Sequence, residues 1–180
     1  DIRLTGTNLF TITDIKSVLE SKEANIFGII PLFGYGNGYT SAVLLEDDAA
    51  TVRTLLRELG YRDATVRVNQ GVSPDGENLI ITFVVEEGVP TVVTDVEIRG
   101  NTAFKTTELE KQLPVIEGKN ISRARSRNGQ RKIAEYYSKA GYFDASVSIS
   151  TDEIGVDAAT GAKQARLIYT IENEGKPVYV

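Results

Sequence analysis

The chain has 180 residues, of which 41% are hydrophobic and 25% are charged, and its formal net charge is −5 at pH 7. This is the composition of an ordinary globular protein, and the acidic balance argues against a nucleic-acid partner. Cys and His are both absent, which excludes disulfides and thiolate chemistry and removes the commonest general base and metal ligand. Met is absent as well, so we expect the sequence to be a segment of a longer chain.

The organising feature of the sequence is an internal repeat. The phrase Ile-Arg-Leu-Thr-Gly ends at Gly6, and the similar phrase Val-Glu-Ile-Arg-Gly ends at Gly100, 94 residues later. A second pair of matching phrases contains Gly60 and Gly141, which are 81 residues apart. Because a repeat of this length defines one structural unit, we expect two domains, at residues 1–90 and 91–180. The difference between the two spacings places 13 additional residues between the helices of the first domain.

The first unit is expected to contain three strands and two helices, separated by an apolar loop. Strands are predicted from alternating or continuous apolar runs, and helices from apolar residues three or four apart. In chain order, the predicted elements are a strand at 2–4, a helix around 12–19, a loop at 26–39, a helix at 45–59 and strands at 64–69 and 79–85. The loop is rich in Gly and aromatic residues and has neither periodicity, so it accounts for the insertion.

The second unit repeats this plan. Its predicted elements are a strand at 96–99, a helix at 107–113, a helix that ends before Gly141 and strands at 145–150 and 166–171. Thr107 and Glu110 have the spacing of a capping box. Each unit is therefore β-α-α-β-β, an α+β fold, and the simplest arrangement is a mixed three-stranded sheet of order 1-3-2 with both helices on one face. Strand 2 is then an exposed edge.

The motifs of both units, taken in order, resemble the polypeptide-transport-associated, or POTRA, module. In the second unit they are Gly-Asn-Thr-Ala-Phe, Ala-Gly-Tyr-Phe-Asp-Ala and Glu-Gly-Lys-Pro; in the first they are Gly6 to Phe10, Leu-Gly-Tyr-Arg-Asp-Ala and Glu87-Gly88. Together they cover nearly the whole chain. The resemblance is to the tandem POTRA arrays of Omp85-superfamily outer-membrane assembly factors, of the BamA or TamA kind.

This resemblance implies a binding function on the periplasmic side of the bacterial outer membrane. The implied partners are unfolded outer-membrane proteins, accessory assembly lipoproteins or subunits, and a C-terminal β-barrel of the same full-length chain. It implies no enzymatic activity, cofactor, metal or nucleic acid. The alternative is a POTRA module of a two-partner secretion transporter or of a cell-division protein.

The second helix of the second unit departs from the family pattern. Family members begin this helix with acidic and aliphatic residues, whereas here it begins Ser-Arg-Ala-Arg-Ser-Arg, so we expect its first turns to fray. The basic residues could contact anionic lipid headgroups or an acidic partner, or they could form a solvated helix face. These residues are Arg123, Arg125, Arg127 and Arg131.

The candidate binding site is a sheet edge, since an edge strand offers unpaired N–H and C=O groups to an extended partner. We expect the second unit to supply the preferred edge, because no charged residue stands between Asp144 and Asp152. Its residues are Ala145, Ser146, Val147, Ser148, Ile149 and Ser150. The corresponding edge of the first unit carries a charge in its middle. Its residues are Ala64, Thr65, Val66, Arg67 and Val68.

Two further segments are candidates for function. The apolar loop could fold over its own core or expose side chains to a partner; these are Phe27, Ile30, Leu32, Phe33 and Tyr35. Gly88 and Pro90 lie at the joint and form the expected hinge. Catalytic sites are not expected, because neither a Ser/His nor a Cys/His pair is possible and no phosphate-binding Gly motif has the required spacing.

Overall fold

The computed structural model describes residues 2–11, 13–14, 38–77 and 79–178, and it excludes the side chains of 38–44 and of Leu79. The described part of the chain divides into two compact units. The first comprises Asp1–Arg57 and Asp63–Gly88, and the second comprises Glu58–Arg62 and Val89–Val180. The apolar loop predicted at 26–39, with all five of its candidate partner residues, lies outside the residues whose structure is described, apart from the backbone at 38–39.

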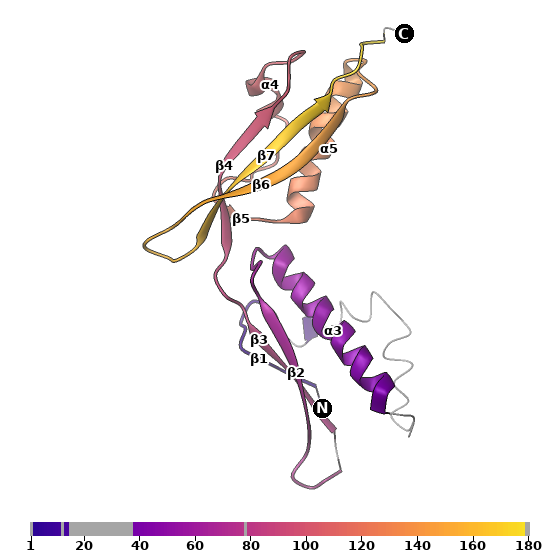
Figure 1. The fold of residues 1–180 in the computed structure, drawn as a ribbon, viewed down its shortest axis with the longest axis vertical. Coiled ribbons are helices and arrows are strands. Elements are labelled where there is room, and N and C mark those ends of the chain that lie inside the picture. The colour runs from indigo at the N-terminus through magenta and orange to yellow at the C-terminus, as the bar shows by residue number, and fades with distance from the viewer. Residues whose placement is uncertain (1, 12, 15–37, 78, 179–180) are drawn as a thin grey trace. The chain divides into compact units, whose positions relative to one another are not determined.

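The first unit contains a three-stranded sheet of order β1-β3-β2, as predicted. Its elements are β1 (Ile2–Thr5), α3 (Gly38–Glu58), β2 (Thr65–Val72) and β3 (Leu79–Glu86) (Figure 1). The central strand β3 is parallel to β1 and antiparallel to β2. Val52 and Leu56 of α3 are buried, as are Val66, Phe83 and Val85 of the sheet. Apolar residues at helical spacing and at strand alternation therefore meet in one core.

The second unit contains a four-stranded sheet of order β5-β4-β7-β6, one strand more than predicted. Its elements are β4 (Thr91–Arg99), α4 (Thr106–Glu110), β5 (Lys119–Asn120), α5 (Arg123–Lys139), β6 (Ser146–Val156) and β7 (Lys163–Asn173) (Figure 1). Without the two-residue strand β5, the order of the remaining strands is again 1-3-2. β4 is parallel to β7, and β6 is antiparallel to β7.

The core of the second unit lies between α4, α5 and one face of the sheet. Leu109 of α4, Ile133 and Tyr137 of α5, and Leu167 and Tyr169 of β7 have no exposed side-chain surface. A cluster of aromatic rings forms part of this core and packs against it. Its rings meet edge to face at centroid distances of 4.9–5.9 Å, a favourable arrangement. The rings belong to Phe104, Tyr136, Tyr137 and Tyr142.

The helix starts differ from the two sequence-based expectations. The capping box predicted at Thr107 is wrong: α4 begins at Thr106, and Glu108 accepts the backbone N–H of Lys105 at 3.2 Å. The Glu108 N–H binds the Lys105 backbone carbonyl at 2.9 Å instead of a side chain, so only the acidic half of such a box is present, two residues earlier. Fraying at the start of α5 is also wrong. The hydroxyl of Ser122 accepts the backbone N–H of Arg125 at 3.3 Å, and this side-chain cap stabilises the first turn despite its basic sequence.

Among the residues that the structure describes, no helix is both long enough and apolar enough to cross a membrane. The same residues contain no cluster of carboxylates arranged to hold a metal ion.

Candidate functional site

Strand β6 forms one edge of the second unit's sheet. It has 11 residues and pairs on one side with β7, whereas its other side has no strand partner among the described residues. The ladder with β7 places Ser148 opposite Thr170, and Ile149 opposite Tyr169. Of the six candidate edge residues, five lie within β6, and Ala145 immediately precedes it. The structure therefore places this set together on, or directly before, the edge strand of the sheet.

The side chains of β6 alternate between the core and solvent. Val147 and Ile149 are half-buried and pack against the core cluster. Ser146 and Ser150 are exposed, and the hydroxyl of Ser148 donates to Glu172 Oε1 at 2.5 Å. The first half of the strand thus carries no formal charge on either face, and no Lys or Pro defends it in the way common at natural edges.

A side chain from α5 also reaches this edge. The helix packs closely on β6, and Gln130 Nε2 donates a hydrogen bond to the Val147 carbonyl at 2.5 Å. Sequence reasoning missed this residue. No local pattern indicates it, because the two partners are separated by 17 residues in the chain and meet only when α5 lies on the sheet.

The corresponding edge of the first unit, β2, carries a charged pair. Arg67 Nη2 lies 3.3 Å from Glu86 Oε1 on the neighbouring strand β3, and the hydroxyl of Thr65 donates to the same carboxylate at 3.2 Å. Ala64 and Val66 are buried, and Val68 is half-buried. An incoming strand would meet this exposed ion pair in the middle of the edge, whereas on β6 the ion pair of Glu153 with Lys163, at 3.8 Å, lies in the second half of the strand.

The four candidate basic residues do not form one free cationic face. Arg123 and Arg127 are exposed, but Arg125 is half-buried and its Nη1 donates to the Asn120 carbonyl at 3.1 Å. Arg131 hydrogen-bonds to Asn128 and lies 3.6 Å from Glu135. Arg125 therefore has a structural role in holding the segment before α5, which its position in a run of basic residues did not indicate.

The two hinge candidates fall in different units. Gly88 ends the first unit and has φ 70°, a left-handed conformation that suits glycine. Pro90 belongs to the second unit, where its carbonyl accepts the backbone N–H of Lys163 at 2.9 Å. Pro90 is thus fixed to the start of β7, and the hinge itself remains a prediction.

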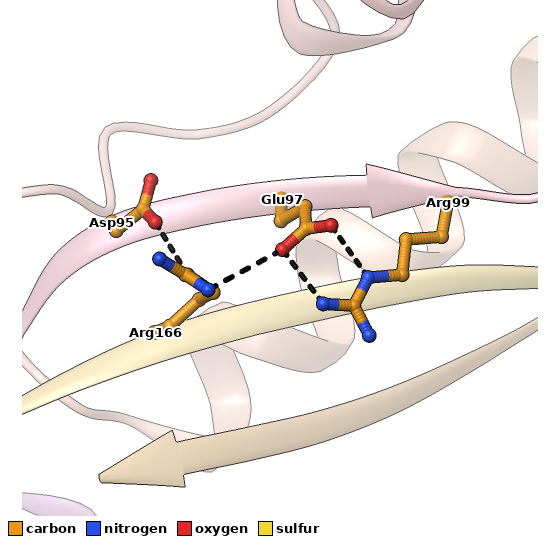
Figure 2. Close-up of polar contacts among 4 residues, drawn as sticks. All are labelled: Asp95, Glu97, Arg99 and Arg166. Carbon is orange, nitrogen blue, oxygen red and sulfur yellow. Dashed lines mark hydrogen bonds and ion pairs between the residues drawn. The ribbon is translucent and has the colours of Figure 1, made fainter. Parts of the chain in front are cut away.

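The face of the sheet opposite the helices carries an ion-pair network across β4 and β7. Figure 2 shows Arg166 between Asp95 and Glu97, with Arg99 bound to the other side of Glu97. Arg166 Nε lies 2.5 Å from Asp95, and Arg99 donates two hydrogen bonds to Glu97, at 2.5 and 2.9 Å. The hydrogen bond from Arg99 lowers the pKa of Glu97. These groups are partly exposed, so the network makes this face polar rather than strongly stabilising the fold.

Glu174 connects the end of β7 to the turn after β4. Its carboxylate accepts the backbone N–H groups of Thr102 and Ala103 at 2.6 and 2.9 Å, the hydroxyl of Thr102, and the buried Tyr137 hydroxyl at 2.7 Å. Partial burial raises the pKa of Glu174, but the four hydrogen bonds outweigh it and lower the pKa to about 2. The sequence marked Glu174 only as part of a repeated closing motif.

The comparisons with known proteins agree on a fold family. The POTRA family profile, described as "Surface antigen variable number repeat", matches residues 1–88 and 91–174. The "Putative outer membrane protein assembly factor" of Treponema pallidum (strain Nichols) is 27% identical over 146 residues, covering 78% of this chain and 16% of that protein. This chain therefore spans a small part of the length of that relative.

A solved structure has the same fold. The crystal structure of Haemophilus influenzae BamA POTRA3-5 superposes with a TM-score of 0.52 at 18% identity, and the match covers 99% of this chain and 66% of the other. At this identity the likeness concerns the fold alone. The family profile matches nearly the whole chain, in two consecutive copies that coincide with the sequence repeat. The chain therefore belongs to the POTRA family and consists of two tandem POTRA repeats.

Proposed function

We propose that this chain is the periplasmic POTRA pair of an Omp85-type outer-membrane β-barrel assembly factor, and that it binds unfolded outer-membrane proteins rather than catalysing a reaction. The similarity to the Treponema assembly factor and to the Haemophilus BamA POTRA domains supports this class of protein. The observation that carries the binding mode is the free edge of β6, which is uncharged from Ala145 to Thr151.

The chemistry of this edge fits a partner of variable sequence. A strand added to β6 would be held mainly by backbone hydrogen bonds, which every extended segment except one rich in proline can make. Each such bond contributes about 0.5–1.5 kcal/mol net, and part of this is lost to the entropy of ordering the partner. Binding through a few of these bonds is weak and reversible, as required of a protein that passes on many different clients.

Two other partner classes follow from the same proposal. Accessory assembly subunits would bind surfaces other than the β6 edge, and a C-terminal β-barrel would belong to the same full-length chain. The exposed guanidinium groups of Arg123 and Arg127 offer a surface for an acidic subunit. The edge of β2 is a second, weaker candidate for strand addition, because the Arg67–Glu86 pair would have to be displaced or accommodated.

The test is binding of an extended peptide to the isotope-labelled chain, followed by amide chemical shifts. A short peptide of alternating Thr and Val residues represents an unfolded barrel strand. We expect the shift changes to map to Ser146–Val156, and we expect the same peptide with methylated backbone amides not to bind. Changes that map to Thr65–Val72, or that persist with the methylated peptide, would show that strand addition at β6 is not the binding mode.

A further inference from the structure

The contact between Gln130 and β6 limits where a partner strand can pair. Edge strands are commonly protected against unwanted pairing. Among the described residues, the contact that can protect the first half of β6 is the hydrogen bond from the Gln130 side-chain amide to the Val147 carbonyl, at 2.5 Å. Gln130 is half-buried between α5 and the strand, so the amide is held in place. A carbonyl that already accepts this bond, with a side chain beside it, is not available to an incoming strand.

The position of this carbonyl sets the orientation of the strand's other backbone groups. The N–H of Lys163 donates to the Pro90 carbonyl on the β4 side of β7, and alternation along β7 then turns Thr170 towards β6, so that its partner Ser148 pairs with β7. We therefore infer that Val147 points its N–H and C=O to the free edge. Because successive residues of a strand point to opposite sides, Ile149, Thr151 and Glu153 do the same, and the intervening residues pair with β7.

An irregularity in the ladder ends this series. The register with β7 runs from Glu153 opposite Ala165 to Gly155 opposite Gln164, which leaves Ile154 as an extra residue. A bulge of this kind reverses the alternation and bends the strand. Beyond Ile154, the backbone groups that face the free edge are therefore out of phase with those before it, and one straight partner strand cannot follow both parts.

These two boundaries define a short docking window, residues 149–153. We propose that an extended client pairs with β6 only at Ile149, Thr151 and Glu153, and that Gln130 sets this register by excluding Val147. The inference rests on the proposed strand addition at β6 and specifies its position. The docking window therefore lies further along β6 than residues 145–150, the set predicted from the absence of charged residues there.

The experiment uses amide hydrogen exchange of the 180-residue chain, with and without the peptide of alternating Thr and Val residues. In the wild type, the peptide should slow exchange at Ile149, Thr151 and Glu153 and leave Val147 unchanged. Gln130→Ala removes the donor at a helical position where Ala is favourable. This variant should gain protection at Val147 and bind about two- to twelvefold more tightly, as expected for one additional hydrogen bond, at the Val147 carbonyl. Lys132→Ala, an exposed change on the same helix, is the matched control and should behave as the wild type.

The outcomes separate this inference from the proposed function. Peptide protection at Val147 in the wild type, or an unchanged affinity and protection pattern in Gln130→Ala, would overturn the docking window while leaving strand addition intact. Protection at Ser148 and Ser150 would show that the opposite set of groups faces the free edge, and would also overturn it. No protection anywhere in Ser146–Val156 would reject strand addition at β6 itself, and the docking window with it.

Discussion

At the scale of single residues, Glu174 has the most connected polar side chain described in the second unit. Its carboxylate binds two backbone N–H groups and two hydroxyls of a turn and a helix that are distant in sequence. An ionised carboxylate can accept all of these bonds at once, whereas a protonated one cannot. The contact therefore links the fold's stability to pH.

The pKa of Glu174 is about 2 in the folded chain against 4.5 for an ordinary Glu. Because the folded pKa is the lower one, the stabilisation is complete above about pH 5 and is lost as the pH falls towards 2. Allowing for solvent screening, we expect Glu174→Gln to lower the free energy of unfolding by about 1–2 kcal/mol at pH 7. Urea denaturation of both proteins should show this difference shrinking below pH 5.

Glu172→Gln provides the control for this prediction. Glu172 is exposed, and its one hydrogen bond among the described residues is with the Ser148 hydroxyl. Its replacement should therefore change the free energy of unfolding by less than about 0.5 kcal/mol. A Glu174→Gln difference that stays constant from pH 7 to pH 2 would contradict the role assigned to the carboxylate charge.

At the scale of elements, the approach of α5 to β7 depends on a glycine. Gly129 lies in the middle of α5, and a Cβ there would lie 2.2 Å from the Tyr169 hydroxyl oxygen and 2.8 Å from the ring carbon that bears it. Tyr169 is fully buried, and its hydroxyl donates to the Ser126 carbonyl at 3.0 Å. The missing side chain thus lets the helix and strand pack around this hydroxyl.

Gly129→Ala should therefore destabilise the second unit, although Ala favours helix by up to about 1 kcal/mol over Gly. Overpacking in a filled core costs about 1–3 kcal/mol, and the clash is with a ring that has no space to move. Tyr169→Phe in the same background removes the closest atom and should recover part of the loss. Urea denaturation of the single and double variants measures this coupling; strictly additive effects would contradict the proposed clash.

At the scale of the whole molecule, each repeat builds its own core. The core cluster of the second unit is drawn entirely from residues between Val93 and Ile171, and its sheet is complete within Thr91–Asn173. We expect residues 89–180 expressed alone to fold, with a dispersed amide spectrum that overlays the same residues of the full chain except near the new terminus and around Asn120, whose side chain binds the Leu59 carbonyl in the full chain. A collapsed spectrum would show that residues 1–88 are required for the second fold.

The sequence determined the repeat, the fold family and the 1-3-2 order of the three strands that both sheets share, but not the fourth strand of the second sheet. These follow from local signals: the apolar alternation around Val96 and Ile98, the glycines at turns such as Gly100, and the helix-ending Gly141. Such signals are set by the backbone preferences of neighbouring residues. They also predict β6 as the less protected edge, since a run of uncharged residues is visible in the chain itself.

The tertiary structure alone decided the contacts that refine this site. Gln130 at the Val147 carbonyl, the bulge at Ile154 and Arg125 at the Asn120 carbonyl join segments whose proximity depends on packing. The short strand β5 likewise forms because the segment after α4 returns to β4. A Gln or an Arg on a helix has the same local pattern whether it meets solvent or a strand edge, so the sequence carries no signal that separates the two.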